Sequence, residues 1–211
     1  MNIEKYIGPE RGGKGYYFFN DNFSFLNIPK NASSTLRRLF DFGNNRVKMQ
    51  DKDDKIFHSR ITFTVIRNPI DRFISGYSEV LKCRHDGPHE YTKSLPFFKI
   101  KDPNLKLKRF ETFIDNICDN LYDEHIKPQK FYLNDIKVQY YILFDNLEIE
   151  VNDMLRENNF QTLNFEKRWN TGFENKDIYK DLIFSNDHIL NKIKELYKKD
   201  FELYENLKNK R

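Results

Sequence analysis

The hydrophobic residues of this chain gather into three short runs separated by polar turns, and each run predicts a buried strand. Residues 23–28, 61–66 and 138–144 consist mainly of aromatic, aliphatic and β-branched side chains. An apolar run of this length is typical of a buried strand. Pro29 should end the first strand, because it has no backbone N–H to donate to a neighbour. Residues 16–20 predict either a further short strand or the approach to the central one.

Apolar residues at helical spacing follow the first two strands. Leu36, Leu39 and Phe40 recur with this period after the first strand, and residues 70–81 carry an apolar stripe after the second. The alternation of strands and helices predicts an α/β fold, a single domain over residues 1–211 with a central parallel sheet flanked by helices. Further helices are predicted at residues 110–121, at residues 150–157 and from residue 187 onward.

The composition narrows the class of protein. Aromatic residues make up 16% of the 211 residues, which favours a packed globule over a disordered chain. A net charge of +4 suits an anionic substrate but is too weak to indicate nucleic acid, so no nucleic-acid partner is expected. The two cysteines form neither a disulfide framework nor a zinc pattern. With no run near the roughly 18 apolar residues of a membrane span, we expect a soluble, cytoplasmic protein without a membrane segment.

Residues 84–109 are charged and rich in turn residues, and predict an insertion or lid.

The turn after the first strand has the features of an anion-binding site. A strand that leads into a polar turn at a helix start directs several backbone N–H groups at one point, and the helix dipole favours negative charge there. Lys30 adds a positive charge, and residues 33–35 add three hydroxyl groups.

Residues 8–15 have the glycine and lysine spacing of the Walker motif, but Gly15 stands where that motif needs serine or threonine. We therefore interpret residues 8–15 as a loop.

Two stretches resemble the nucleotide-binding motifs of sulfotransferases that use PAPS (3′-phosphoadenosine-5′-phosphosulfate). Residues 28–35 resemble the loop that binds the 5′-phosphosulfate, written in carbohydrate sulfotransferases as I/V-P-K-x-A/G-x-[ST]-[ST]. Residues 67–77 resemble the signature R-[DNH]-P-x-x-R-x-x-S-x-Y, which binds the 3′-phosphate. The residues that match this second signature are Arg67, Asn68, Pro69, Arg72, Ser75 and Tyr77.

Residues 125–129 resemble the H-W-x-P-Q element of the Golgi-type chondroitin and dermatan sulfotransferases, although Ile126 replaces the tryptophan. Together the three stretches indicate the carbohydrate branch of the PAPS-dependent family and a P-loop-like domain. The resemblance implies transfer of a sulfuryl group from PAPS, a co-substrate that needs no metal, to a hydroxyl of a carbohydrate or glycan acceptor. It names no particular sugar and no oligomeric state.

The resemblance also implies roles for individual residues. Lys30 would neutralise the charge that develops on the leaving 5′-phosphate. Arg67 and Ser75 would hold the 3′-phosphate, one with a charged planar fork and the other with a neutral donor. Arg168 would be a further nucleotide contact, because family members place a basic loop near the cofactor. The phosphosulfate would be held by backbone N–H groups and hydroxyls of Asn31, Ala32, Ser33, Ser34 and Thr35.

The acceptor hydroxyl must lose a proton, and histidine is the side chain best tuned to take it. We favour His58 as this base, because related carbohydrate sulfotransferases place a catalytic histidine between the two motifs. His125 lies in the H-x-x-P-Q stretch and is the second candidate for an active-site histidine. For each histidine the alternative is an ordinary surface or hydrogen-bonded side chain.

Two other classes of function stay open. A P-loop kinase or NTPase could use Asp145, which follows a predicted strand, as a magnesium ligand, but the Walker hydroxyl residue is missing. A non-catalytic relative would bind an anionic nucleotide or a sulfated glycan. The joint presence of Lys30, Arg67 and Ser75 argues against such a loss of activity.

Overall fold

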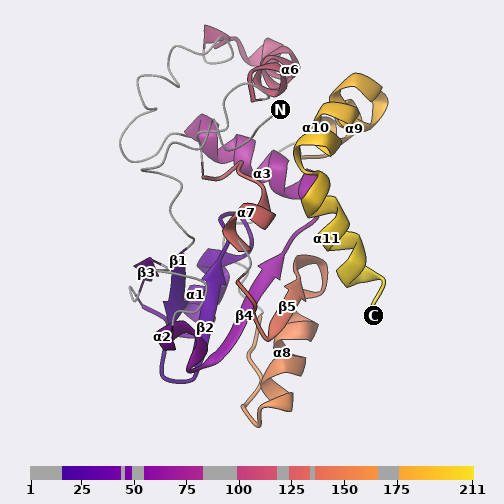
Figure 1. Ribbon diagram of the computed structural model, residues 1–211. Helices are drawn as coiled ribbons and strands as arrows, with labels where there is room; N and C mark the ends of the chain where they lie inside the picture. The colour runs from indigo at the N-terminus through magenta and orange to yellow at the C-terminus, as the bar shows by residue number, and fades with distance from the viewer. Residues whose placement is uncertain are drawn as a thin grey trace. The chain divides into compact units, whose positions relative to one another are not determined.

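The structure is a computed structural model and describes residues 16–43, 46–48, 55–82, 99–117, 124–133, 136–165 and 176–211. The chain divides into two compact units (Figure 1). The sheet unit comprises residues 9–68, 128–171 and 199–211, and the helical unit comprises residues 1–8, 69–127 and 172–198. The single domain expected over residues 1–211 stays a prediction.

Five strands form one sheet in the order β3-β1-β2-β4-β5 (Figure 1). β2, β4 and β5 are parallel, and Phe63 of β4 lies opposite Phe25 of β2 and Tyr140 of β5. The α/β class and the three predicted strands are therefore confirmed. Residues that follow these strands lie at one edge of the sheet, the carboxyl edge, and residues that precede them lie at the opposite amino edge. The strands are β1 (Tyr16–Phe19), β2 (Phe23–Asn27), β3 (Arg46–Lys48), β4 (Ile61–Ile66) and β5 (Tyr140–Leu143).

The expectation of a parallel sheet needs correction at one side, where β1 is antiparallel to both β2 and β3. The connection from β1 to β2 allows only a hairpin, since a parallel pair needs a crossover of about a dozen residues or more. Asn20 shapes this turn, because its Oδ1 accepts hydrogen bonds from the N–H groups of Asn22 and Phe23 at 3.0 and 2.8 Å. β3 lies outside the apolar runs from which strands were predicted.

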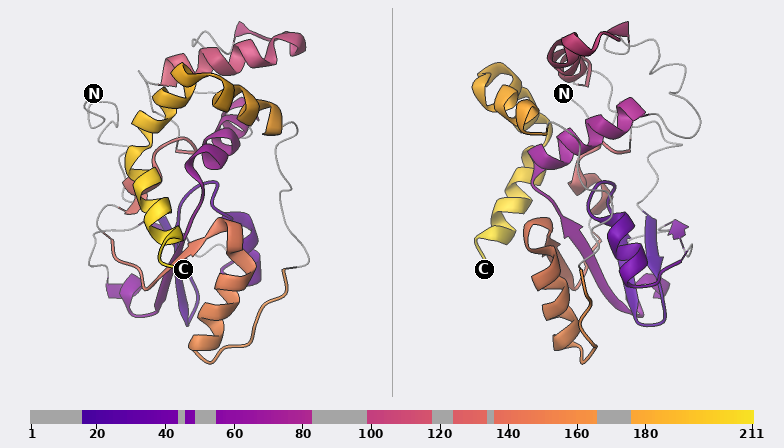
Figure 2. Two further views of the ribbon diagram at one scale, coloured as in Figure 1. Left: turned by 90° about the vertical axis from the view of Figure 1, so that its right-hand side faces the viewer. Right: turned by 180° about the vertical axis from the view of Figure 1, so that it is seen from behind.

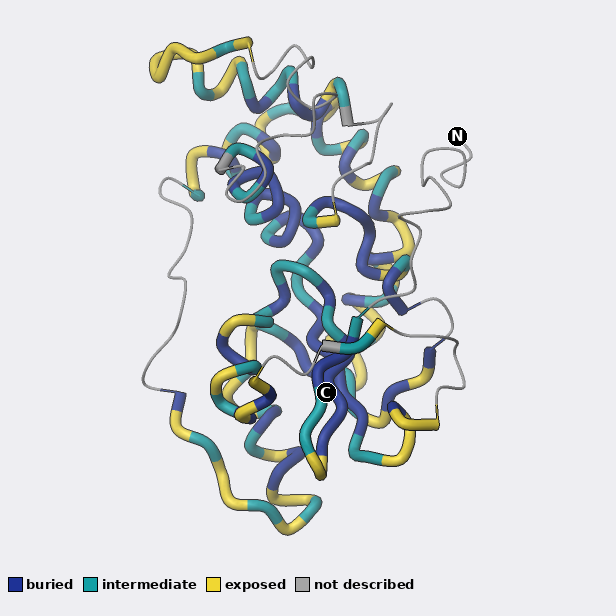
Figure 3. The backbone as a smooth tube through the Cα atoms, turned by 90° about the vertical axis from the view of Figure 1, so that its left-hand side faces the viewer, coloured by how far each residue is buried: buried dark blue, intermediate teal, exposed yellow. Residues whose placement is uncertain are grey.

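Helices cover both faces of the sheet, and the strands are buried along most of their length (Figure 3). On one face, the rings of Phe25 and Phe63 stack at 5.1 Å between centroids and share a core with residues of α1 and α8. On the other face, Leu26 and Ile66 share a core with residues of α7 and α11. α8 runs alongside β5 (Figure 2). The helices of the sheet unit are α1 (Ser33–Leu39), α2 (Lys55–His58), α7 (Gln129–Leu133), α8 (Leu147–Glu157) and α11 (Lys198–Lys208), with the 3₁₀ turn η3 (Phe144–Asn146).

The helical unit has an aromatic core. The ring of Tyr77 on α3 lies 4.7 Å between centroids from the rings of both Phe110 and Phe113 on α6. The helix expected from residue 187 onward is divided at Tyr197 into α10 and α11. Of the expected lid at residues 84–109, residues 84–98 lie outside the described part. The elements of this unit are α3 (Pro69–Lys82), η2 (Pro103–Leu105), α6 (Lys106–Ile117), α9 (Lys176–Ser185) and α10 (Asp187–Leu196).

The segment around His125 lies directly against α3. A Cβ atom at Gly76 would lie 2.5 Å from the carbonyl oxygen of His125, so only glycine allows this approach. The buried Arg72 donates from Nη1 to the carbonyl of Lys127 at 2.6 Å, and the hydroxyl of Tyr197 donates to the carbonyl of Ile126. These contacts fix the backbone of residues 125–127 within the helical unit.

An acidic residue in the first turn of α3 joins this helix to α9. Asp71 forms ion pairs with Lys180 and Lys176, with distances from its Oδ1 to their Nζ atoms of 2.7 and 2.9 Å. Burial alone would raise the pKa of Asp71, but these two lysines outweigh it and hold the pKa below its ordinary value of 3.8. The Asp71 carboxylate is therefore stabilised by folding.

Candidate active site

The turn between β2 and α1 has the backbone conformation of an anion-binding nest. Lys30 and Ala32 have positive φ angles of 72° and 64°, whereas Asn31 between them does not. Such alternation directs successive N–H groups to one side and forms a concave site for an anion. A positive φ costs a residue with a side chain about 1–2 kcal/mol, and strain of this kind is concentrated at functional sites. Residues 30–32 therefore show the alternation of φ found in a nest, although the N–H of Asn31 donates to the carbonyl of Ile28 at 3.1 Å.

Arg67 follows β4 and lies next to this nest. Its Nη1 donates to the carbonyl oxygen of Lys30 at 2.9 Å, and its guanidinium lies 4.3 Å from the centroid of the Phe144 ring. The structure thus brings Lys30 and Arg67 together at the carboxyl edge. Ligands of parallel α/β sheets bind at this edge, outside the carboxyl ends of the strands.

Gln129 ties the nest to the end of β4. Its Oε1 accepts from Nδ2 of Asn31 at 2.6 Å and from the N–H of Arg67 at 2.9 Å, and its Nε2 donates to the carbonyl of Arg67 at 2.8 Å. Sequence reasoning assigned no separate role to the side chains of Asn31 and Gln129. The H-x-x-P-Q stretch was the signal that could have pointed to Gln129.

Asp145 follows β5 at the same edge. Its carboxylate accepts a hydrogen bond from the hydroxyl of Tyr204 on α11. Burial, together with this carboxylate, raises the pKa of Tyr204 well above its ordinary value, while a hydrogen bond from Asn68 acts in the opposite direction. This phenol therefore stays protonated at neutral pH and remains a donor to Asp145. The kinase alternative still lacks the serine or threonine that would bind magnesium in the Walker motif.

The model of the sulfotransferase family matches residues 17–205 of the chain. The chain belongs to the sulfotransferase family. No curated protein and no solved structure gives a significant match. The matched segment includes both predicted nucleotide motifs, and the family establishes sulfuryl transfer as the general reaction. In the described part of this sulfotransferase, no helix is both long and apolar enough to cross a membrane.

The turn between β2 and α1 and the first turn of α1 contain three hydroxyl groups in different settings. The hydroxyl of Ser33 donates to Oδ1 of Asn27, so its proton is directed back toward β2. Ser34 is exposed in the first turn of α1, and Thr35 is buried. Among these three residues, Ser34 is therefore the most exposed to solvent.

His58 does not lie beside the turn between β2 and α1. It is exposed at the end of α2 and precedes β4, which places it at the amino edge of the sheet, whereas Lys30 and Arg67 lie at the carboxyl edge. A strand of this length spans about 20 Å at roughly 3.3 Å per residue. The prediction that His58 is the base stays a prediction, and this topology argues against it.

Other predicted site residues lie outside the sheet unit or outside the described residues. Ser75 is half-buried in the second turn of α3, and His125 is half-buried in the turn that packs on Gly76. Both belong to the helical unit. Arg168 lies outside the described residues.

Proposed function

We propose that this sulfotransferase takes its sulfuryl group from PAPS and transfers it to a hydroxyl of a carbohydrate. The observation that carries the proposal is the hydrogen bond from Nη1 of Arg67 to the carbonyl of Lys30. It joins the motif expected to bind the 5′-phosphosulfate to the motif expected to bind the 3′-phosphate. A single nucleotide with phosphate groups at both positions would bind both motifs.

In the proposed reaction, the acceptor oxygen forms a bond to sulfur while the bond from sulfur to the 5′-phosphate oxygen breaks. The products are the sulfated acceptor and adenosine 3′,5′-bisphosphate. Lys30 neutralises the charge on the departing oxygen, and backbone N–H groups of residues 32–35 hold the phosphosulfate, since the N–H of Asn31 donates to the carbonyl of Ile28. Arg67 and Ser75 hold the 3′-phosphate, and Arg168 adds a further nucleotide contact.

A histidine accepts the proton of the acceptor hydroxyl in this proposal. Of the two candidates, we favour His125 over His58. His58 lies at the amino edge, away from Lys30, while His125 belongs to the same short stretch as Gln129, which contacts the phosphate loop. The carbohydrate acceptor is supported by the likeness of residues 125–129 to chondroitin and dermatan sulfotransferases.

The test is transfer of labelled sulfate from PAPS to a panel of glycans. Lys30→Ala should lower the rate by about 100-fold or more, because removal of one preorganised charge or donor costs this much. Lys55→Ala is the matched control, since Lys55 is exposed on α2 at the amino edge. Equal transfer by wild type and Lys30→Ala would overturn the mechanism. Binding of the nucleotide without transfer to any acceptor would favour the non-catalytic alternative, and magnesium-dependent ATP turnover would favour a kinase or NTPase.

A further inference from the structure

The side-chain amide of Gln129 pairs with the backbone of Arg67 as a neighbouring strand would. It accepts from the N–H of Arg67 and donates to the carbonyl of the same residue, at 2.9 and 2.8 Å. The Gln129 side chain is fully buried. In effect one amide continues the hydrogen-bonding pattern of the sheet past the end of β4, where Arg67 must be held.

The second contact of this amide is with the phosphate loop. Asn31 is fully buried and donates from Nδ2 both to Oε1 of Gln129 and to the carbonyl of Val65, at 2.6 and 2.7 Å. Asn31 lies between the two residues whose φ angles are positive. Its side chain therefore anchors the nest to β4 and to Gln129.

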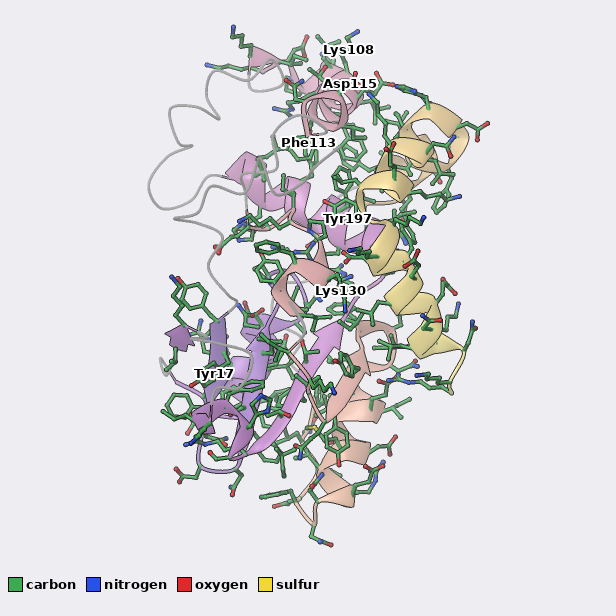
Figure 4. All side chains as sticks on the ribbon, in the orientation of Figure 1. Tyr17, Lys108, Phe113, Asp115, Lys130 and Tyr197 are labelled. Carbon is green, nitrogen blue, oxygen red and sulfur yellow. The ribbon has the colours of Figure 1, made fainter. Side chains whose placement is uncertain are left out.

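A buried carboxylate on α11 holds Gln129 in place. Asp200 is fully buried, its Oδ2 accepts from the N–H of Gln129 at 2.6 Å, and its Oδ1 accepts from the N–H of Lys130 at 2.8 Å. The first N–H groups of a helix have no partner within the helix, so Asp200 supplies one from a distant part of the chain. Lys130 marks this end of α7 in Figure 4.

From these contacts we infer that Asp200 and Gln129 are positioning residues for nucleotide binding. Asp200 fixes the start of α7, the amide of Gln129 then fixes Arg67 and Asn31, and Asn31 fixes the nest that includes Lys30. Glutamine suits this place because it offers an acceptor and a donor together; glutamate would present an oxygen to the carbonyl of Arg67. The inference rests on the proposed function, since it names the residues that shape the proposed nucleotide site.

The experiment is calorimetric titration with adenosine 3′,5′-bisphosphate, at a temperature where circular dichroism shows each variant to be folded. Gln129→Met and Asp200→Asn should each weaken binding by about 10-fold or more, because loosely held binding groups lose preorganisation. Glu202→Gln is the matched control, since Glu202 is an exposed carboxylate on the same helix, and its affinity should equal that of wild type.

A double variant separates positioning from general stability. If Asp200 acts through Gln129, then Gln129→Met with Asp200→Asn should bind no more weakly than the weaker single variant. The inference would be overturned if the losses of binding free energy in the two single variants added in full in the double variant. It would also be overturned if the single variants were folded and bound the nucleotide with wild-type affinity. If Asp200→Asn does not fold, Gln129→Met alone decides by the same criterion of affinity. Failure of wild type to bind the bisphosphate would instead overturn the proposed function.

Discussion

Replacement of Gly76 by alanine should destabilise the helical unit, because α3 has no room for a methyl group at this position. The added Cβ would lie 2.5 Å from the carbonyl oxygen of His125 and 2.9 Å from Cγ2 of Ile126. The isoleucine methyl can rotate away, but the carbonyl is backbone and is held by its neighbours. Either α3 or residues 125–127 must therefore move.

Two opposing effects set the size of the change at Gly76. Alanine is favoured over glycine within a helix by about 1 kcal/mol, whereas overpacking a tight site costs about 1–3 kcal/mol. Because this contact is short and involves backbone, its cost should lie at the upper end of the range for overpacking. We therefore expect a net loss of about 1–2 kcal/mol in the free energy of unfolding. For a chain of this length, that loss lowers the melting temperature by about 2–8 °C.

The assay is thermal unfolding followed by circular dichroism, together with the rate of sulfuryl transfer. Gly43→Ala is the matched control, since Gly43 has a φ of 55° but nothing within 4 Å of its added Cβ. It should lose about 1 kcal/mol from backbone strain alone and keep its transfer rate. Gly76→Ala should lose transfer as well, because it displaces His125. A melting temperature for Gly76→Ala at or above that of wild type would refute the reasoning.

Three further predictions concern individual charged and titratable residues. His125→Ala should lower sulfuryl transfer by about 100-fold or more, while His58→Ala should change it little; the reverse order of rates would restore His58 as the base. Asp71→Asn should cost about 1 kcal/mol of stability at neutral pH. Because folding lowers the pKa of Asp71, its contribution is complete above pH 3.8 and is lost as the pH falls through the folded-state pKa. The free energies of unfolding of wild type and Asp71→Asn, measured with denaturant, should therefore become equal at low pH. A difference that stays the same at every pH would contradict this. Arg67→Lys should weaken nucleotide binding measured by calorimetry, because lysine lacks the planar fork that stacks on an aromatic ring. An affinity equal to that of wild type would contradict this role of the Arg67 guanidinium.

The sequence predicted the strands that consist of a continuous run of apolar residues. β2, β4 and β5 are covered on both faces, so they appear as apolar runs whatever their partners are. β3 is three residues long at the edge of the sheet and has no such pattern. The direction of β1 depends on the short connection to β2, which an apolar run does not reveal.

For the site, the motifs predicted Lys30 and Arg67 because each motif is local in the sequence. The network through Gln129 and Asp200 joins residues that are 71 positions apart, and no local pattern specifies that pairing. One sign was visible, since Asp200 is a charged residue on the buried face of a helix, where an unpartnered carboxylate would be costly. His58 was favoured by analogy, although a residue that precedes a parallel strand lies at the sheet edge opposite Lys30 and Arg67.

The central claim is that the motifs around Lys30 and Arg67 bind the two phosphates of one nucleotide. Calorimetry that compares adenosine 3′,5′-bisphosphate with adenosine 5′-monophosphate tests it most directly, because the two ligands differ only in the 3′-phosphate. A charge-assisted contact of about 1.5–3 kcal/mol predicts that the bisphosphate binds roughly 10- to 100-fold more tightly. Arg67→Ala should remove most of this difference. Equal affinity of wild type for both nucleotides, or a difference that persists in Arg67→Ala, would contradict the account.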